Sequence, residues 1–129
     1  MKTFHDKYER CFMRVISQIE KYRIAKLEEH VHPIFEWEKL HGRIIFAQAT
    51  ISAQNPQVLE NLVDYINGRI HKEENEPKIK LYANNKYKNG YDLVIFPDFN
   101  SPEEEWLKQT EEIVCSLPRA IESFHMKKP

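Results

Sequence analysis

The chain has 129 residues, of which 41% are hydrophobic and 30% are charged, and its formal net charge is -1. This length and composition are those of one ordinary soluble domain and exclude an intrinsically disordered chain. The near-neutral charge gives no field that would indicate a nucleic acid, a membrane surface or an acidic partner. We therefore expect a single domain over residues 1–129.

Sequence motifs that the chain lacks exclude several further classes of function. The chain has three glycines, and it lacks the motifs GxGxxG, GxxxxGK(S/T) and GxSxG, so nucleotide-binding loops of these types are excluded. Charges interrupt the apolar runs near the N-terminus, so we expect neither a signal peptide nor a membrane span. Cys11 and Cys115 form no CxxC, and we expect both to be reduced and buried in a cytoplasmic protein.

The first predicted element is a long helix from Phe4 to about Leu27. Apolar residues recur there at helical spacing, and no Pro or Gly interrupts them. The helix has to end before Pro33. Its last turns, residues 23–31, could already be extended.

Residues 32–38 and 43–52 predict an antiparallel hairpin with a short loop. Alternate residues of the second strand share a face. The face that carries Ala47 and Ala49 has side chains small enough for a helix to pack closely, and the opposite face carries Phe46.

A second helix is predicted to begin at Pro56. Asn55 is its N-cap, and Pro56 stands at the first helical position, where the missing N–H costs nothing. The charged segment 71–77 is expected to be a loop. The predicted buried stripe of the helix is Leu59, Leu62, Val63, Ile66 and Ile70.

Residues 78–83 and 91–96 predict a second hairpin. The first of these strands alternates apolar and polar residues, as an edge strand does, whereas the second is apolar on both faces from Leu93 to Phe96 and suits a central position. Ser101 and Pro102 then begin a last helix in a capping box. Pro118 is expected to bend or restart that helix.

These elements follow the order α-ββ-α-ββ-α. The simplest packing is an α+β fold with a mainly antiparallel four- or five-stranded sheet and helices packed chiefly on one face. In this order the chain resembles the secretion-chaperone type of fold, in which an N-terminal helix precedes a strand–helix–strand–helix unit. The likeness concerns the fold and implies no function.

Three histidines, His30, His32 and His41, are close in sequence. On an extended segment His30 and His32 would share a face, and a nearby carboxylate could complete a metal site. A metal-dependent hydrolase or nuclease using this cluster is therefore one alternative function. A polar hairpin with exposed histidines explains the same pattern, since the spacing matches no zinc motif.

Arg23 precedes His30 with six residues between them. This spacing resembles the active-site signature of the HEPN ribonucleases, which cleave RNA without a metal and are helical throughout. The strands predicted here depart from that pattern. The spacing also arises readily by chance in a charged helix.

The second hairpin carries lysines beside tyrosines. Such a surface can bind single-stranded RNA or DNA, because lysines neutralise phosphates and aromatic rings stack on bases. Lysines on an edge strand also discourage unwanted strand pairing, which explains the pattern without a ligand. The candidate residues are Lys78, Lys80, Lys86, Lys88 and Tyr87.

An aromatic sheet face is the remaining candidate. If helices cover one face of the sheet, the other presents aromatic side chains, and an uncovered patch of this kind marks a protein interface. Alternatively, the first helix crosses to that side and buries it. The candidate interface residues are Phe35, Trp37, Phe46 and Tyr82.

From these observations we expect a small non-enzymatic protein-binding module of the inhibitor, immunity or chaperone/adaptor type, acting as a homodimer through the aromatic face. Its expected partner is another protein, such as a toxin, an effector or a host factor, and not a membrane. No catalytic residue and no cofactor is predicted.

Overall fold

The computed structural model of the chain describes residues 2–34, 38–40, 43–45, 47–70, 78–96 and 103–127. In these residues four strands lie between the first and second helices and two between the second and third, which confirms the predicted α+β class. The elements are α1 (Lys2–Lys21), β1 (Ala25–Leu27), β2 (Glu38–Leu40), β3 (Arg43–Ile45), β4 (Ala47–Ala53), α2 (Pro56–Ile70), β5 (Lys78–Ala83), β6 (Gly90–Phe96) and α3 (Glu103–Met126).

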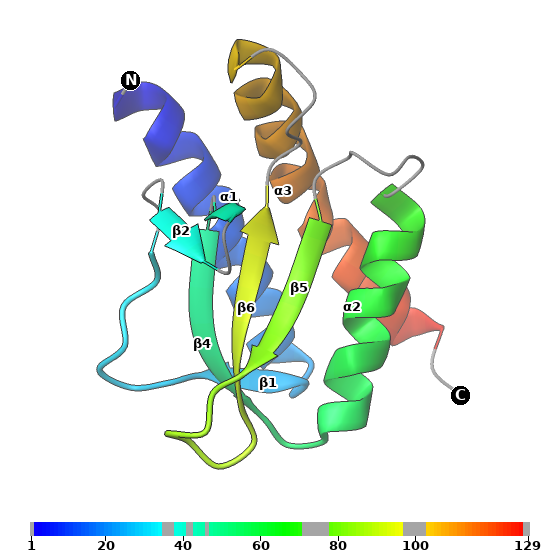
Figure 1. Cartoon of the computed structure of the whole chain (residues 1–129). Coiled ribbons are helices and arrows are strands. Elements are labelled where there is room, and N and C mark those ends of the chain that lie inside the picture. Colours follow the sequence, from blue (N-terminus) through cyan, green and yellow to red (C-terminus); the bar gives the residue numbers. More distant parts are fainter. Residues whose placement is uncertain are drawn as a thin grey trace.

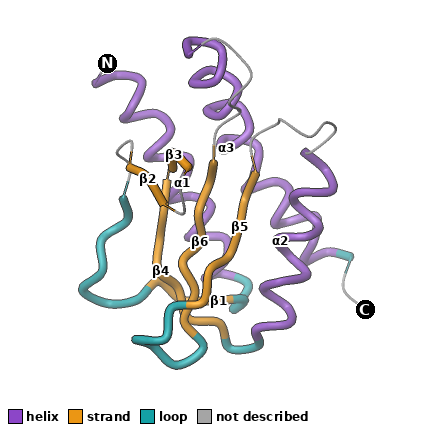
Figure 2. Tube along the Cα trace, viewed as in Figure 1, coloured by secondary structure: helices purple, strands orange, loops and turns teal. Residues whose placement is uncertain are grey.

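The described strands form a four-stranded antiparallel sheet in the order β1-β4-β6-β5 and a separate two-stranded ribbon of β2 and β3 (Figures 1 and 2). In the sheet, Ala47 of β4 lies opposite Ile95 of β6. On the other side of β6, Lys78 of β5 lies opposite Phe96. As predicted, β6 is central and β5 lies at the edge.

The three helices cover one face of this sheet. Figure 1 shows α1 and α3 passing behind the strands and α2 running beside β5. Alternate residues of β4, including Ala47 and Ala49, are buried in the core with the apolar stripes of the helices. The helix residues of this core include Phe12, Ile16 and Ile19 of α1, Leu59, Leu62 and Ile66 of α2, and Val114, Leu117 and Ile121 of α3.

The first helix ends at Lys21, earlier than the predicted end near Leu27. Arg23 adopts a left-handed conformation with φ of 57°, and the N–H of Ile24 donates to the carbonyl of Ile19 at 3.0 Å. This is a Schellman-type helix end, and Ile19 and Ile24 are both buried in the same hydrophobic core. Residues 25–27 then form β1, so the extended alternative for this segment is confirmed.

The first hairpin differs from its predicted form. Glu38 pairs with Ile45 and Leu40 with Arg43, as a hairpin requires, but the ribbon they form is separate from the main sheet. The main-sheet neighbour of β4 at this side is β1, which places the buried Ala25 opposite Ala53. Of residues 32–34, Ile34 forms one isolated antiparallel bridge with Gln48 of β4.

The strand-to-helix junction at Asn55 is confirmed. The Asn55 Oδ1 atom accepts the N–H of Gln57 at 3.1 Å, and α2 begins at Pro56. The second junction, at Ser101 and Pro102, lies outside the described residues. In α3 the helix continues through Pro118 without restarting.

The expectation of reduced cysteines is wrong. Cys11 of α1 and Cys115 of α3 form a disulfide, with their Cα atoms 4.8 Å apart, a separation within the usual range for such bonds. The two helices run parallel, because Tyr22, just after the end of α1, stacks on His125 near the end of α3, so both contacts advance in the same direction along the two helices. This packing brings together two cysteines that are 104 residues apart.

Disulfides persist in oxidising compartments and are rare in the cytosol. The predicted cytoplasmic location rested on reduced cysteines, so it loses that support. Among the described helices, none combines the length and the apolar character needed to cross a membrane.

Candidate functional site

A groove of about 310 Å³ lies between α2 and the edge strand β5. Its volume is at the lower end of the range of about 300–1,000 Å³ that ligand sites occupy. Two elements from different parts of the chain form it. Its lining residues are Glu60, Val63, Asp64 and Asn67 of α2 and Ile79, Lys80 and Leu81 of β5.

The helical side of the groove has an apolar floor and an acidic rim. Glu60 and Asn67 are each three or four positions from both Val63 and Asp64, which places the four residues on one side of the helix. Val63 is buried and, with Ile79 of the strand, closes the groove toward the core. Glu60 and Asp64 are exposed, so the rim on α2 is negatively charged.

Asn67 shows which way the backbone of β5 points. Its Nδ2 donates to the carbonyl of Ile79 at 2.8 Å, and the N–H of Ile79 donates to Asn67 Oδ1 at 3.1 Å. The side-chain amide thus takes the place that a neighbouring strand would take at this residue. Because β5 is also paired with β6, the two groups of Ile79 must point away from β6.

The same argument applies to the next residues of the strand. In an antiparallel pair, the direction of the backbone groups alternates along each strand. Leu81 and Ala83 therefore also point their N–H and C=O groups away from β6, toward the side where the groove lies. Within the described part of the chain, no hydrogen bond reaches these outward groups. Among the described residues, Asn67 therefore closes the edge at Ile79, and none closes it at Leu81 or Ala83.

The predicted aromatic interface is described only in part. Phe35, Trp37 and Phe46 lie outside the described residues. Tyr82 is half-buried on the outer face of β5, where its ring meets the ring of Phe96 edge-on at 6.3 Å between centroids. The interface role of these four residues stays a prediction.

The outer face of the sheet is nevertheless covered at β6. Val94 and Phe96 point to this face, yet they are only 0% and 1% exposed. Besides its sheet neighbours β4 and β5, β6 is in contact with β3 of the small ribbon, which Figure 2 shows beside the upper ends of β4 and β6. The alternative that the first helix covers this face is wrong, because α1 packs in the core on the other side.

The lysine–tyrosine hairpin forms at the predicted position, and its candidate residues are divided between the strand β5 and the loop that follows it. Lys80 is exposed on the strand β5, whereas Lys86 and Lys88 are exposed on the loop that joins β5 to β6. Tyr87 is half-buried in that loop. Lys78 begins β5, and its side chain is not among those that the structure describes. Nucleic-acid binding by this hairpin stays a prediction.

The histidine cluster is not arranged as expected. His30 and His32 are exposed in a loop, and His30 is left-handed with φ of 68°, so no strand places the two imidazoles on one face. His41 lies outside the described residues. Among the residues that are described, no group of three or more His, Cys, Asp or Glu side chains could hold a metal ion.

Arg23 and His30 do not lie in a helix. Arg23 is in the turn that ends α1, and His30 is in the loop after β1. The helical arrangement that the ribonuclease family uses is therefore not formed by these two residues.

A polar row on the outer face was not anticipated from the sequence. Asp92 Oδ1 accepts hydrogen bonds from Thr50 Oγ1 at 2.8 Å and from Asn84 Nδ2 at 3.1 Å. Two residues farther along β4, the Ser52 hydroxyl donates a hydrogen bond to the Glu28 carboxylate. These bonds link β6 to β4 and to the loop after β5, and β4 to the segment after β1.

A cationic and aromatic cluster joins the ends of α2 and α3. The Tyr65 ring lies 5.6 Å from that of Phe124, and the Lys127 ammonium lies 5.3 Å from the centre of the Tyr65 ring. The Arg69 guanidinium donates to the Tyr65 hydroxyl oxygen at 2.9 Å. This hydrogen bond lowers the pKa of the Tyr65 phenol below its ordinary value. Desolvation raises that pKa by a smaller amount, and the positive charges of Arg69 and Lys127 lower it further.

We expect Arg69→Gln to raise the pKa of Tyr65 toward the ordinary value of 10.0. A pKa lowered by folding adds stability that is fully present above the unfolded value and is lost as the pH falls through the folded value. The wild type should therefore exceed the variant in stability at alkaline pH more than at neutral pH. NMR titration of the Tyr65 ring, with Lys108→Gln as a control for charge, measures the shift. An unchanged pKa would contradict the assigned cause.

Comparison of the chain with protein-family models, with curated proteins and with solved structures finds no match in any of the three.

Proposed function

We propose that this chain is a small non-enzymatic protein-binding module that holds an extended segment of a partner protein beside β5. The observation that carries this proposal is the open edge at Leu81 and Ala83, next to a groove with an apolar floor. Strand addition to a sheet edge is a recurring mode of peptide recognition. Main-chain hydrogen bonds supply affinity in this mode, and alternate side chains supply specificity.

The charges of the groove indicate the composition of the segment. Glu60 and Asp64 line the α2 side and are exposed, so they favour a partner segment that carries a lysine or an arginine. The apolar floor at Val63 and Ile79 favours an aliphatic side chain at an alternate position. An extended segment with alternating aliphatic and basic residues fits both surfaces.

The identity of the partner is a separate matter. A toxin, an effector or a host factor could supply such a segment, and so could a second copy of this chain, which would make the predicted homodimer. The disulfide favours a setting in which oxidised thiols persist, so a cytoplasmic location forms no part of this proposal.

A display library of random peptides, selected on the purified oxidised protein, tests the proposal. We expect enriched peptides with alternating aliphatic and basic residues. Ala83→Pro removes the outward N–H, which an edge position tolerates, whereas the matched control Ala83→Ser keeps it. The loss of one hydrogen bond, about 1 kcal/mol, should weaken binding about five-fold in the proline variant only.

Reversing a charge on the α2 side of the groove provides a second test of the proposal. Asp64→Lys should weaken the binding of basic peptides, whereas Glu112→Lys on α3 should leave it unchanged. If no peptide is enriched, or if binders tolerate both Ala83→Pro and Asp64→Lys, the proposal is wrong. Sedimentation of the protein alone identifies the occupant, because a dimer that Ala83→Pro dissociates would place a second copy on this edge.

A further inference from the structure

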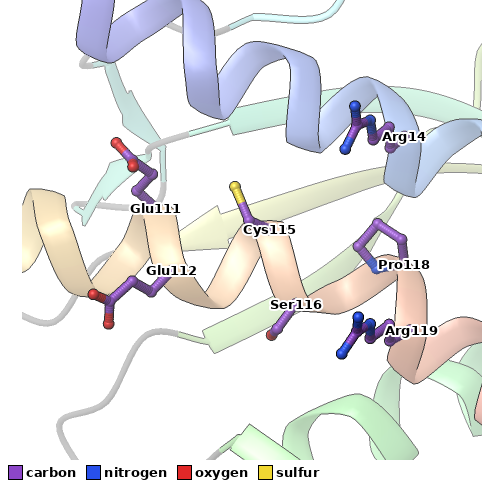
Figure 3. A pocket seen from close by; sticks show the side chains of 7 residues that line it. All are labelled: Arg14, Glu111, Glu112, Cys115, Ser116, Pro118 and Arg119. Carbon is purple, nitrogen blue, oxygen red and sulfur yellow. The ribbon is translucent and has the colours of Figure 1, made fainter.

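A second groove, of about 570 Å³, lies over the disulfide between α1 and α3. Cys115 lines it, and Figure 3 shows the Cys115 sulfur pointing from α3 toward α1. The two cysteines differ in exposure, because Cys11 is 8% exposed within the core whereas Cys115 is only half-buried and lines the groove. A reagent that enters from this groove therefore meets Cys115.

Charged groups stand on both sides of that sulfur. Glu111 and Glu112 precede Cys115 by about one helical turn, and Arg119 follows it by about one turn, while Arg14 reaches the groove from α1 (Figure 3). One turn corresponds to about 5.4 Å along the helix. The groove therefore presents carboxylates, then sulfur, then guanidinium groups along α3.

The two arginines are available to a ligand. Arg14 and Arg119 are exposed, and neither makes a hydrogen bond or an ion pair with any residue in the described part of the chain. The Ser116 hydroxyl, by contrast, donates to the carbonyl of Ile113 in its own helix at 2.7 Å. Recognition in this groove would depend on the guanidinium and carboxylate groups.

We propose that Cys115 is a site of thiol–disulfide exchange with a small zwitterionic thiol, a molecule that carries an ammonium group and a carboxylate on either side of its sulfhydryl. The ammonium faces the exposed Glu112, and the carboxylate faces Arg119 and Arg14. Arginine binds carboxylates through paired hydrogen bonds, which orients the thiol over the sulfur. This inference is independent of the groove beside β5.

The reaction needs no oxidant. The incoming thiolate attacks the Cys115 sulfur and forms a new S–S bond, the Cys11–Cys115 bond breaks, and Cys11 leaves as a thiolate that takes a proton from water. In the reverse direction, the Cys11 thiolate attacks the Cys115 sulfur of the mixed disulfide and releases the small thiol. The product joins the thiol to α3 and removes the covalent link between α1 and α3.

Exchange with reduced glutathione, compared with cysteamine at equal thiolate concentration, tests the proposal. After acid quenching, peptide mapping by mass spectrometry should find the adduct on Cys115. We expect glutathione, which carries carboxylates, to react about ten-fold faster than cysteamine, which has none. Arg14→Gln and Arg119→Gln should each reduce this preference, whereas Arg69→Gln, which makes the same charge change on another surface, should not.

A rapid return reaction could hide the adduct, so a second measurement uses Cys11→Ser with oxidised glutathione. This variant cannot resolve the mixed disulfide, and it should form the Cys115 adduct with the same dependence on Arg14 and Arg119. An adduct on Cys11 in the wild type, equal rates for the two thiols, or arginine variants that react as the wild type does would each overturn the proposal.

Discussion

Removing the disulfide by the double change Cys11→Ser and Cys115→Ser should lower the free energy of unfolding by about 4–5 kcal/mol. The bond joins positions 104 residues apart, and a cross-link over a loop of this length removes much of the entropy of the unfolded chain. Since a domain is stable by only about 5–15 kcal/mol, this is a large share of the total. Urea unfolding followed by circular dichroism measures the difference.

The wild-type protein treated with dithiothreitol is the control for this prediction. It lacks the bond but keeps both cysteines, so it separates the loss of the cross-link from the effect of a serine hydroxyl at the buried position 11. The reduced wild type and the double variant should unfold at similar urea concentrations. Equal stability of the oxidised and reduced proteins, or thiols that react freely in the untreated native protein, would show that the bond does not form.

The substitution Phe96→Ala should cost about 3–5 kcal/mol of stability. Phe96 is 1% exposed on the face of the sheet opposite the helices, so its removal leaves a cavity that the surrounding structure fills only partly. If this face were open to solvent, the phenylalanine ring would already be hydrated and the change would cost little. The measurement therefore tests whether the outer face is covered.

Two further variants calibrate that experiment. Phe12→Ala removes a fully buried ring from the helical side of the core and should cost a similar amount. Met13→Ala, at the next position of α1, changes a side chain that is 37% exposed and should cost much less. A Phe96→Ala cost near that of Met13→Ala would contradict a covered outer face.

Much of the fold could be predicted because its signals are local. Asn55 and Pro56 mark the start of α2 through capping and the fixed φ of proline, and both effects act within a few residues. The apolar run from Leu93 to Phe96 marks a central strand, and the alternation in residues 78–83 marks an edge. The structure confirms each of these elements.

The end of α1 shows where local signals fail. A left-handed residue ends the helix, and glycine is the usual residue at such a position. Arg23 takes the position instead, so no glycine in the sequence marks the stop. The burial of Ile19 and Ile24 in the same core favours this end, and that burial depends on the packed core rather than on propensity.

The candidate sites were less predictable than the fold. Lining residues of the β5 groove such as Glu60, Asp64 and Asn67 are ordinary helix-surface residues in the sequence, and nothing there shows that Asn67 reaches the backbone of Ile79. The histidine pattern pointed to a metal, but it assumed an extended segment that the left-handed His30 interrupts.

By itself, the sequence determined the α+β class, the order of most elements, the start of α2 and the positions of β5 and β6, because periodicity and capping are properties of neighbouring residues. The tertiary structure alone decided that Cys11 meets Cys115, that α2 lies along the open edge of β5, and that Val94 and Phe96 are covered. These features join segments that are far apart in the chain. They depend on how helices and strands pack together, which no local pattern encodes.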